Sequence, residues 1–137
     1  MVYFDHNLIG KSSPPKTFEV TLEAVKHFME ATEDPALHGK EPLQYAPPTF
    51  PTTFRIRVPD LQLDPTTMQL LRGEQQYTYI RQLRIGEQVT CVAHIADVRE
   101  RHGKTGTMAF IITETIGTDS QQQLVYTARS VLIVRQK

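Results

Sequence analysis

The prolines of this 137-residue chain are confined to its first half, which constrains where a sheet can form. All nine lie between Pro14 and Pro65, and none follows. Proline has no backbone N–H to donate to a strand ladder and is therefore rare inside a sheet. We expect a continuous sheet in the second half of the chain and shorter, interrupted elements in the first half.

The proline-free half is expected to contain four strands. Their alternating or continuous apolar patterns cover residues 74–83, 88–98, 106–116 and 123–134. The second of these is apolar on both faces, which is typical of a central strand. In the first, Gln75, Tyr77, Tyr79 and Arg81 are expected on one face. Turn-like sequences at 84–87, 101–106 and 117–121 predict that each pair of successive strands is antiparallel and adjacent.

The first half predicts a strand, a helix, a loop and a second helix. The strand is expected over 16–22 and the first helix after Thr21, a plausible N-cap. Apolar residues at helical spacing run from Leu22 to Met29, and Pro35 ends the pattern. A second, short helix is expected over 49–57. The order predicts an α+β fold in which an antiparallel sheet of about five strands wraps around a central helix.

The charge balance and the single cysteine narrow the class of protein. Fifteen basic and fifteen acidic side chains give a net charge of zero, which disfavours nucleic acid as a partner and is compatible with an oligomer. Cys91 alone cannot form an intrachain disulfide, which favours a reducing compartment. The sequence lacks a long apolar run and a basic, apolar start, so we expect a cytoplasmic protein without a membrane span.

Six short segments, in their order and spacing, resemble the MaoC-like N-terminal family, also called FAS1-like dehydratase domains. They are "LIGK" at 8–11, "FEVTLEAVKHFMEATED" at 18–34, "APPTF" at 46–50, "RGEQQYTYIRQLRIGEQV" at 72–89, "HGKTGTMAFIITET" at 102–115 and "LVYTARSVLIVR" at 124–135. The family includes the substrate-binding subunits of mycobacterial (3R)-hydroxyacyl-ACP dehydratases. The resemblance implies one hotdog domain over 1–137.

The resemblance also implies a role in fatty acid metabolism. The ligand would be an acyl-CoA or acyl-ACP thioester, and the assembly a homodimer or a heterodimer with a MaoC-like catalytic subunit. No cofactor and no metal are expected. The chain departs from the family pattern in three places: Arg72 stands where histidine is usual, Gln82 stands where proline is usual, and the connection before 46–50 is short.

Glu33 and His38 are the candidate acid–base pair. Hydration of an enoyl thioester needs a carboxylate and a histidine to deprotonate one water and protonate the α-carbon. Catalytic relatives place aspartate five residues before histidine, which is the spacing here. Glutamate is longer than aspartate, however, and Pro35 and Ala36 stand where asparagine and proline are usual. Exposed loop residues, or residues that shape a partner's site, remain alternative interpretations.

The oxyanion donor, a backbone N–H that would bind the thioester oxygen, is expected near residues 46–50. Pro47 and Pro48 have no N–H, so Thr49 and Phe50 are the candidates, with Phe54 as a further substrate-binding residue. Among the other reactive side chains, Cys91 is expected to be a packed thiol. The Gly-Lys-Thr at 103–105 lacks the rest of a phosphate loop and is expected to be a hairpin turn.

Three hypotheses follow. In the first, the chain is a subunit of a 3-hydroxyacyl-thioester dehydratase or enoyl-CoA hydratase that binds the acyl chain, while a partner supplies the catalytic Asp/His pair. In the second, it is a non-catalytic acyl-thioester-binding or scaffold homodimer. In the third, it is a self-sufficient hydratase that uses Glu33 and His38.

Overall fold

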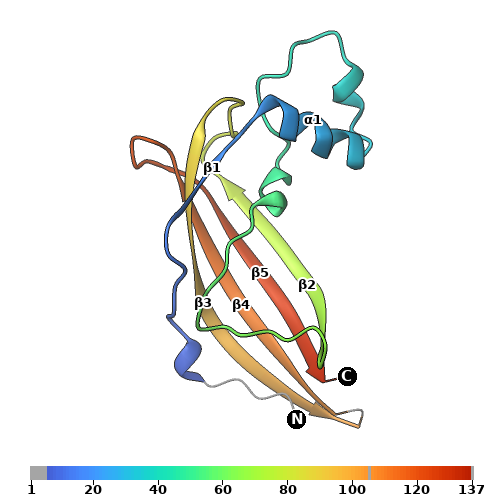
Figure 1. The fold of residues 1–137 in the computed structure, drawn as a ribbon, viewed down its shortest axis with the longest axis vertical. Helices are drawn as coiled ribbons and strands as arrows, with labels where there is room; N and C mark the ends of the chain where they lie inside the picture. Colours follow the sequence, from blue (N-terminus) through green and yellow to red (C-terminus); the bar gives the residue numbers. More distant parts are fainter. Residues whose placement is uncertain (1–5, 105, 137) are drawn as a thin grey trace.

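The proline-free half forms the long strands of one sheet (Figure 1). The computed structural model describes residues 6–104 and 106–136. The strands are β1 (Lys16–Glu19), β2 (Met68–Tyr79), β3 (Gln88–Gly103), β4 (Gly106–Thr118) and β5 (Leu124–Gln136). The helical elements are α1 (Leu22–Ala31) and three short 3₁₀ turns: η1 (His6–Leu8), η2 (Pro35–His38) and η3 (Phe50–Thr53).

The sheet is antiparallel throughout, with the order β1-β3-β4-β5-β2. The prediction of one antiparallel sheet in the second half is therefore confirmed. The prediction that every short link joins adjacent strands is wrong for residues 80–87, because β2 pairs with β5 whereas β3 pairs with β1 and β4. Eight extended residues reach roughly 26 Å, which is enough to cross between strands that are not neighbours.

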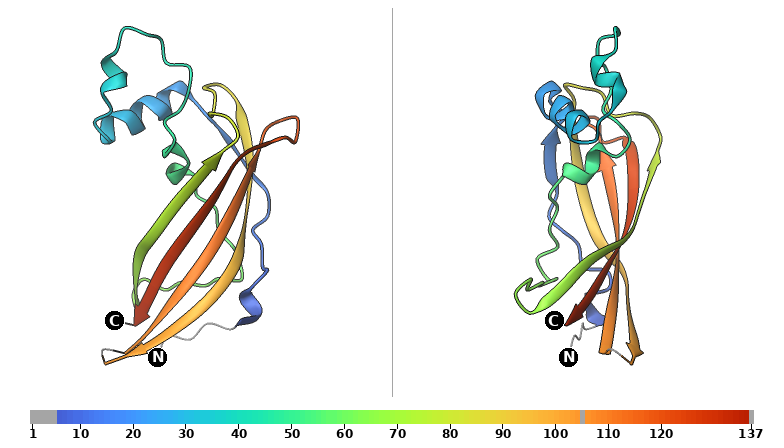
Figure 2. Two further views of the ribbon diagram at one scale, coloured as in Figure 1. Left: turned by 180° about the vertical axis from the view of Figure 1, so that it is seen from behind. Right: turned by 90° about the vertical axis from the view of Figure 1, so that its right-hand side faces the viewer.

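The start of α1 is fixed by a side-chain N-cap. The Thr21 hydroxyl accepts a hydrogen bond from the Ala24 N–H at 3.1 Å, as the sequence predicts for an N-cap. Val25 and Met29 are buried, and they pack with residues of β3, β5 and η3. The helix therefore covers one end of the curled sheet (Figure 2), and the sheet together with α1 has the expected hotdog architecture.

The second predicted helix, over residues 49–57, is reduced to the single turn η3. Phe54 already has extended backbone angles, and residues 54–67 form turns but no helix or strand. Val58 precedes Pro59, and a residue before proline disfavours the α region. The segment 54–67 consequently runs along the concave face of the sheet in place of a longer helix (Figure 1).

Two clusters of buried residues lie beneath these covers. One, under α1 and η3, contains Val25, Met29, Phe50, Cys91 and Tyr126 among others. The other, under segment 54–67, contains Val58, Ile95, Ile111 and Val134 among others.

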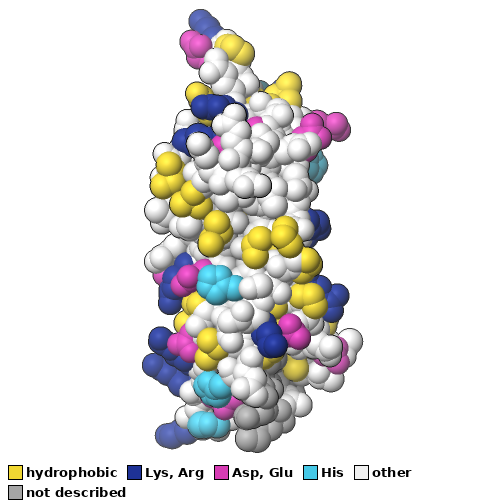
Figure 3. All heavy atoms as spheres, turned by 90° about the vertical axis from the view of Figure 1, so that its left-hand side faces the viewer, with side chains coloured by type: hydrophobic (Ala, Val, Ile, Leu, Met, Phe, Trp, Pro, Cys, Tyr) yellow, Lys and Arg dark blue, Asp and Glu magenta, His cyan; other side chains and the backbone are white. Residues whose placement is uncertain are grey.

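The surface over β1 and β3 carries basic and acidic side chains close to one another (Figure 3). Mixed charge of this kind agrees with the net charge of zero and would attract the phosphates of a nucleic acid only weakly. Within residues 6–104 and 106–136, no helix has the length and apolar character needed to span a membrane.

Candidate functional site

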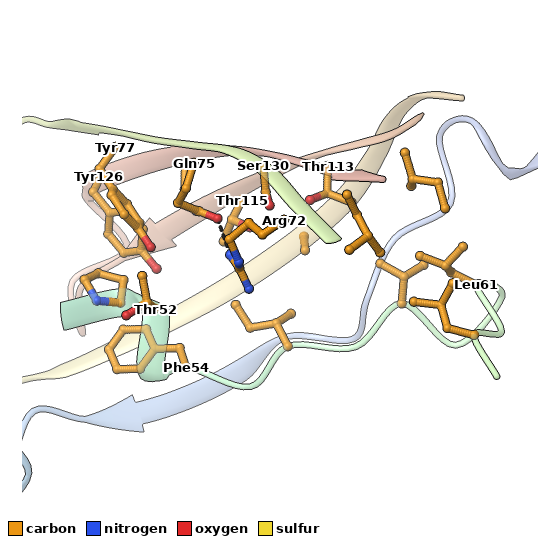
Figure 4. Close-up of a pocket in the computed structure, with 18 residues that line it drawn as sticks. Thr52, Phe54, Leu61, Arg72, Gln75, Tyr77, Thr113, Thr115, Tyr126 and Ser130 are labelled. Carbon is orange, nitrogen blue, oxygen red and sulfur yellow. Dashed lines mark hydrogen bonds between the residues drawn. The ribbon is translucent and has the colours of Figure 1, made fainter. Parts of the chain in front are cut away.

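A cavity of about 250 Å³ separates the concave face of the sheet from η3 and segment 54–67 (Figure 4). Its apolar walls come from both sides. They include Ile56, Val58, Leu61 and Leu63 from the segment, and Ile111 and Leu132 from the sheet. At about 250 Å³, this partly apolar cleft lies just below the usual range of about 300–1,000 Å³ for ligand pockets in proteins.

A row of polar side chains crosses the floor of the cavity. Gln75 on β2 is in register with Ser130 on β5, and Ser130 is in register with Thr113 on β4. All three line the cavity, and Thr115 lies one row further along β4. Within the described residues, the hydroxyls of Ser130, Thr113 and Thr115 make no side-chain hydrogen bond, so they are available to a ligand or to water.

Arg72 enters the same cavity because β2 contains a bulge. The register of β2 against β5 shifts between Arg72 and Glu74, which leaves Gly73 as the extra residue. The bulge reverses the alternation of faces, so that Arg72 and Gln75 both line the cavity. The Arg72 guanidinium donates a hydrogen bond to Oε1 of Gln75 (Figure 4). None of the residues that line the cavity is an aspartate or a glutamate.

Aromatic side chains close the end of the cavity beside η3. Tyr77, Tyr126 and Phe54 line it, as the labelled view shows (Figure 4). Tyr79 lies next to them and donates a hydrogen bond to the Pro48 carbonyl at 2.6 Å, which ties β2 to the loop before η3. Burial raises the pKa of Tyr77 although the Arg72 charge acts to lower it, and burial also raises the pKa of Tyr126. These phenols are therefore neutral hydrogen-bonding groups at physiological pH.

Cys91 is a packed thiol, as the sequence predicts. It is fully buried, and its Sγ lies 3.2 Å from the Tyr126 hydroxyl. Burial raises the pKa of Cys91, which suppresses the thiolate that a nucleophile would need.

Glu33 and His38 lie on the turn between α1 and the following loop, and neither lines the cavity. Glu33 has a left-handed backbone with φ of 55°. Its N–H bonds the Glu30 carbonyl and the Asp34 N–H bonds the Met29 carbonyl, which together form a Schellman C-cap of α1. His38 is the last residue of η2. Both candidate side chains are exposed to solvent.

The three candidates around η3 differ in what they can offer. The Phe50 N–H donates to the Pro47 carbonyl at 2.9 Å, so it is already occupied, and the Phe50 ring is buried. Thr49 is exposed, and its N–H has no acceptor within residues 6–104 and 106–136. Phe54 lines the cavity and stacks on Phe18 with ring centroids 4.4 Å apart.

The sequence pattern predicted that Gln75, Tyr77, Tyr79 and Arg81 share one face. Gln75 and Tyr77 do line the cavity, but the pattern did not predict that Arg72, Thr113 and Ser130 line it as well. The alternation of apolar and polar residues along β2 does not reveal that a bulge changes which face each side chain occupies. The only local hint is Gly73, since glycine inside a strand often marks a bulge. Within the described part of the chain, no group of three or more His, Cys, Asp and Glu side chains is arranged to hold a metal ion.

Residues 7–128 match the sequence profile of the FAS1-like, dehydratase domain region. The chain belongs to the FAS1-like dehydratase domain family. A relative from Streptomyces griseus, called a UPF0336 protein, is 30% identical over 150 residues, which cover 96% of this chain and 95% of the relative. A UPF0336 protein of Saccharopolyspora erythraea is 27% identical over 146 residues, with 96% and 91% coverage.

Solved structures share the fold at lower identity. The HadBC (3R-hydroxyacyl-ACP dehydratase) complex of Mycobacterium tuberculosis contains a chain that is 19% identical, with a TM-score of 0.71 and coverage of 92% of this chain and 96% of that one. The ChsH1–ChsH2 complex of the same organism gives 20% identity, a TM-score of 0.65 and coverage of 89% and 83%. At such identities the likeness establishes the hotdog fold.

Proposed function

We propose that this chain is the acyl-chain-binding subunit of a 3-hydroxyacyl-thioester dehydratase or enoyl-CoA hydratase, and that a partner hotdog subunit supplies the catalytic Asp/His pair. The observation that carries the proposal is the separation between the cavity and the candidate acid–base pair. The cavity lies under η3 and segment 54–67, whereas Glu33 and His38 are exposed on the turn after α1.

The cavity suits the acyl part of a thioester. Its walls combine Phe54 and the aliphatic side chains of segment 54–67 with Ile111 and Leu132 of the sheet. Burial of methylene groups against such walls stabilises binding by roughly 0.8 kcal/mol for each CH₂ group. Phe54 and the neighbouring turn η3 would then hold the part of the chain closest to the thioester.

The turn after α1 supports a structural role for Glu33. Its backbone caps the helix, and the neighbouring Asp34 accepts a hydrogen bond from the Ala36 N–H at 3.0 Å, which caps η2. An acid–base residue needs its side chain within hydrogen-bond reach of the reacting water. The Phe50 N–H is already bonded, so Thr49 is the remaining oxyanion donor of the two candidates.

Activity measurements with and without a partner test the proposal. The purified chain should hydrate crotonyl-CoA and octenoyl-CoA no faster than buffer. Addition of a hotdog subunit from the same genome that carries aspartate five residues before histidine should produce hydration. Glu33→Gln or His38→Ala should leave that activity within a few-fold, since loss of a true general base costs about 10²- to 10⁴-fold.

A variant pair in the cavity separates acyl binding from scaffolding. Ser130→Met fills space next to the polar row, whereas Ser130→Ala removes only the hydroxyl. Ser130→Met should raise KM for octenoyl-CoA more than for crotonyl-CoA, and Ser130→Ala should not. Equal kinetics of both variants with both substrates would favour a scaffold without an acyl site. Turnover by the chain alone that either Glu33→Gln or His38→Ala abolishes would establish the self-sufficient hydratase instead.

A further inference from the structure

The polar groups in the cavity are not required by an acyl chain made only of methylene groups. A simple hydrocarbon tail would be served by the apolar walls alone, and a charged side chain beside it would have to give up part of its hydration. Here Arg72, Gln75, Ser130 and Thr113 all line the same cavity. Their arrangement indicates a ligand with a polar group of its own.

The positive charge of Arg72 indicates that the polar group of the ligand is negatively charged. Within the described residues, Arg72 makes no ion pair, and its side chain donates a hydrogen bond to Oε1 of the neutral Gln75. Three other arginines, Arg81, Arg99 and Arg129, do form ion pairs, each with a carboxylate within 4 Å. No aspartate or glutamate lines the cavity. The cavity therefore has a net positive charge that an anion would complement.

The bulge in β2 brings the Arg72 side chain into the cavity. In a regular strand without the bulge, Arg72 and Gln75 would lie on opposite faces, because they are three residues apart and successive side chains alternate. The bulge brings both inward. Since Oε1 of Gln75 accepts from Arg72, the amide NH₂ of Gln75 is the donor: one of its hydrogens faces the Tyr77 hydroxyl, and the other is left for a ligand. An anion beside Arg72 would meet guanidinium and amide donors together, with Ser130 and Thr113 next in the same row.

The position of Arg72 in the cavity indicates which part of the ligand carries the anionic group. The aromatic end beside η3 is separated from Arg72 by two rows of β2 side chains, which is roughly 13 Å at two residues per row. The arginine side chain extends back over part of that distance (Figure 4). A chain whose thioester lies at the η3 end would reach Arg72 with its far end.

We propose that the cavity selects an acyl chain that ends in a carboxylate, and that Arg72 and Gln75 receive that carboxylate. The inference rests on the proposed function for the thioester end of the ligand. Arginine and carboxylate form paired, charge-assisted hydrogen bonds that are stronger than neutral ones. Arg72 is exposed, so the carboxylate keeps access to solvent as it enters.

Acyl-CoA probes that differ only at the far end test this inference. Hexanoyl-CoA is compared with adipoyl-CoA, and octanoyl-CoA with suberoyl-CoA, by isothermal titration calorimetry on the full chain. Charge-assisted hydrogen bonds change affinity by roughly 10- to 100-fold, so the carboxylate-ended member of at least one pair should bind about tenfold more tightly. The preference should shrink as the salt concentration is raised.

Two variants should remove the preference. Arg72→Gln removes the charge, and Gln75→Glu places a carboxylate of the chain itself beside Arg72. Each should bring the two members of a pair to within about twofold by weakening the carboxylate-ended one, because the remaining contacts are shared. Arg129→Gln makes the same charge change outside the cavity and should keep the preference.

The remaining outcomes would overturn the inference in different ways. Equal weakening of both members by Arg72→Gln would assign Arg72 to the CoA phosphates. Equal binding of both members by the unaltered chain would mean that Arg72 is solvated or is held by a partner's carboxylate. In either case the proposed acyl-binding function would stand.

A probe without CoA separates the two proposals when no thioester binds. Adipate alone is titrated while the side-chain amide signals of Gln75 are followed by NMR. Shifts that disappear in Arg72→Gln would support the carboxylate site although the acyl-thioester function has failed. Unchanged signals, together with no thioester binding, would overturn both proposals.

Discussion

Glu33 combines an unfavourable backbone with an exposed side chain. Its φ of 55° lies in the left-handed region, where a side chain costs roughly 1–2 kcal/mol relative to glycine. Glycine is the usual residue at this position of a Schellman cap. We expect Glu33→Gly to raise the free energy of unfolding by about 0.5–1 kcal/mol, as measured by urea denaturation.

The same substitution also tests the role of the carboxylate. Partner-dependent hydration should persist in Glu33→Gly, whereas a loss as large as that of a general base would assign Glu33 to catalysis. Glu30→Gly is a matched control, because it removes a glutamate inside α1. It should lower stability by about 1 kcal/mol through lost helix propensity.

Gly117 is required by the Tyr126 ring. A Cβ atom at Gly117 would lie 2.2 Å from Cε1 of Tyr126, which is itself fully buried. Since the ring is enclosed, it cannot simply move away. We expect Gly117→Ala to lower the free energy of unfolding by at least about 1–3 kcal/mol. Gly103→Ala is the control, because its Cβ would make an ordinary 3.8 Å contact; equal thermal midpoints for the two variants would contradict this prediction.

Among the elements, the link between β2 and β3 is fixed by an ion-pair network. Arg81 donates to both carboxylate oxygens of Glu87 at 2.8 Å and to Asp119 at 3.2 Å, which ties residues 80–87 to the β4–β5 turn. Burial acts to raise the pKa of Glu87, but hydrogen bonds from Arg81 and the Arg84 N–H hold it below its ordinary value. The Gln123 N–H and Arg81 likewise lower the pKa of Asp119.

This network should make stability depend on pH in the acid range. A carboxylate whose pKa is lower in the folded state stabilises the fold above its ordinary pKa, and that stabilisation is lost as the pH falls. We expect Arg81→Gln to destabilise the chain by about 1–2 kcal/mol at pH 7. The difference from the unaltered chain should shrink below the ordinary Glu87 pKa of 4.5. Urea midpoints at pH 7 and pH 3.5 measure it, and a difference that persists unchanged at pH 3.5 would contradict it.

The strands also show how far the sequence could predict this fold. The absence of proline located the half of the chain that forms the sheet, and the apolar patterns located its four long strands, although β2 begins at Met68 and ends at Tyr79 instead of covering 74–83. Thr21 located the start of α1. The strand order escaped prediction because the length of residues 80–87 permits both a hairpin and a crossing. The residues of the cavity floor could not be predicted, because a bulge changes which face each side chain occupies. The pairing with the neighbouring strand decides where a bulge forms. The helix over 49–57 failed where Phe54 turns to extended backbone ahead of Pro59.

For the whole molecule, the two edges of the sheet are unequal. β1 forms one edge with four residues, and β2 forms the other with twelve. A long edge strand leaves backbone N–H and C=O groups without strand partners, which favours pairing with another chain. β2 also carries the exposed Leu71, which is 45% accessible. These features support assembly through β2, with a second copy or with the proposed catalytic subunit.

Light scattering on variants of exposed leucines tests this assembly. The unaltered chain at micromolar concentration should give twice the monomer mass of 15.6 kDa, or should shift to a one-to-one complex when the partner subunit is added. Leu71→Lys places a charge beside the β2 edge and should shift the equilibrium towards the monomer, because lysine at an edge opposes strand pairing. Leu124→Lys is the matched control, since Leu124 is similarly exposed at 41% but lies on β5, which has a neighbour on each side. A mass of 15.6 kDa at every concentration, unchanged by the partner, would contradict assembly, and dissociation by both variants alike would locate the contact away from β2.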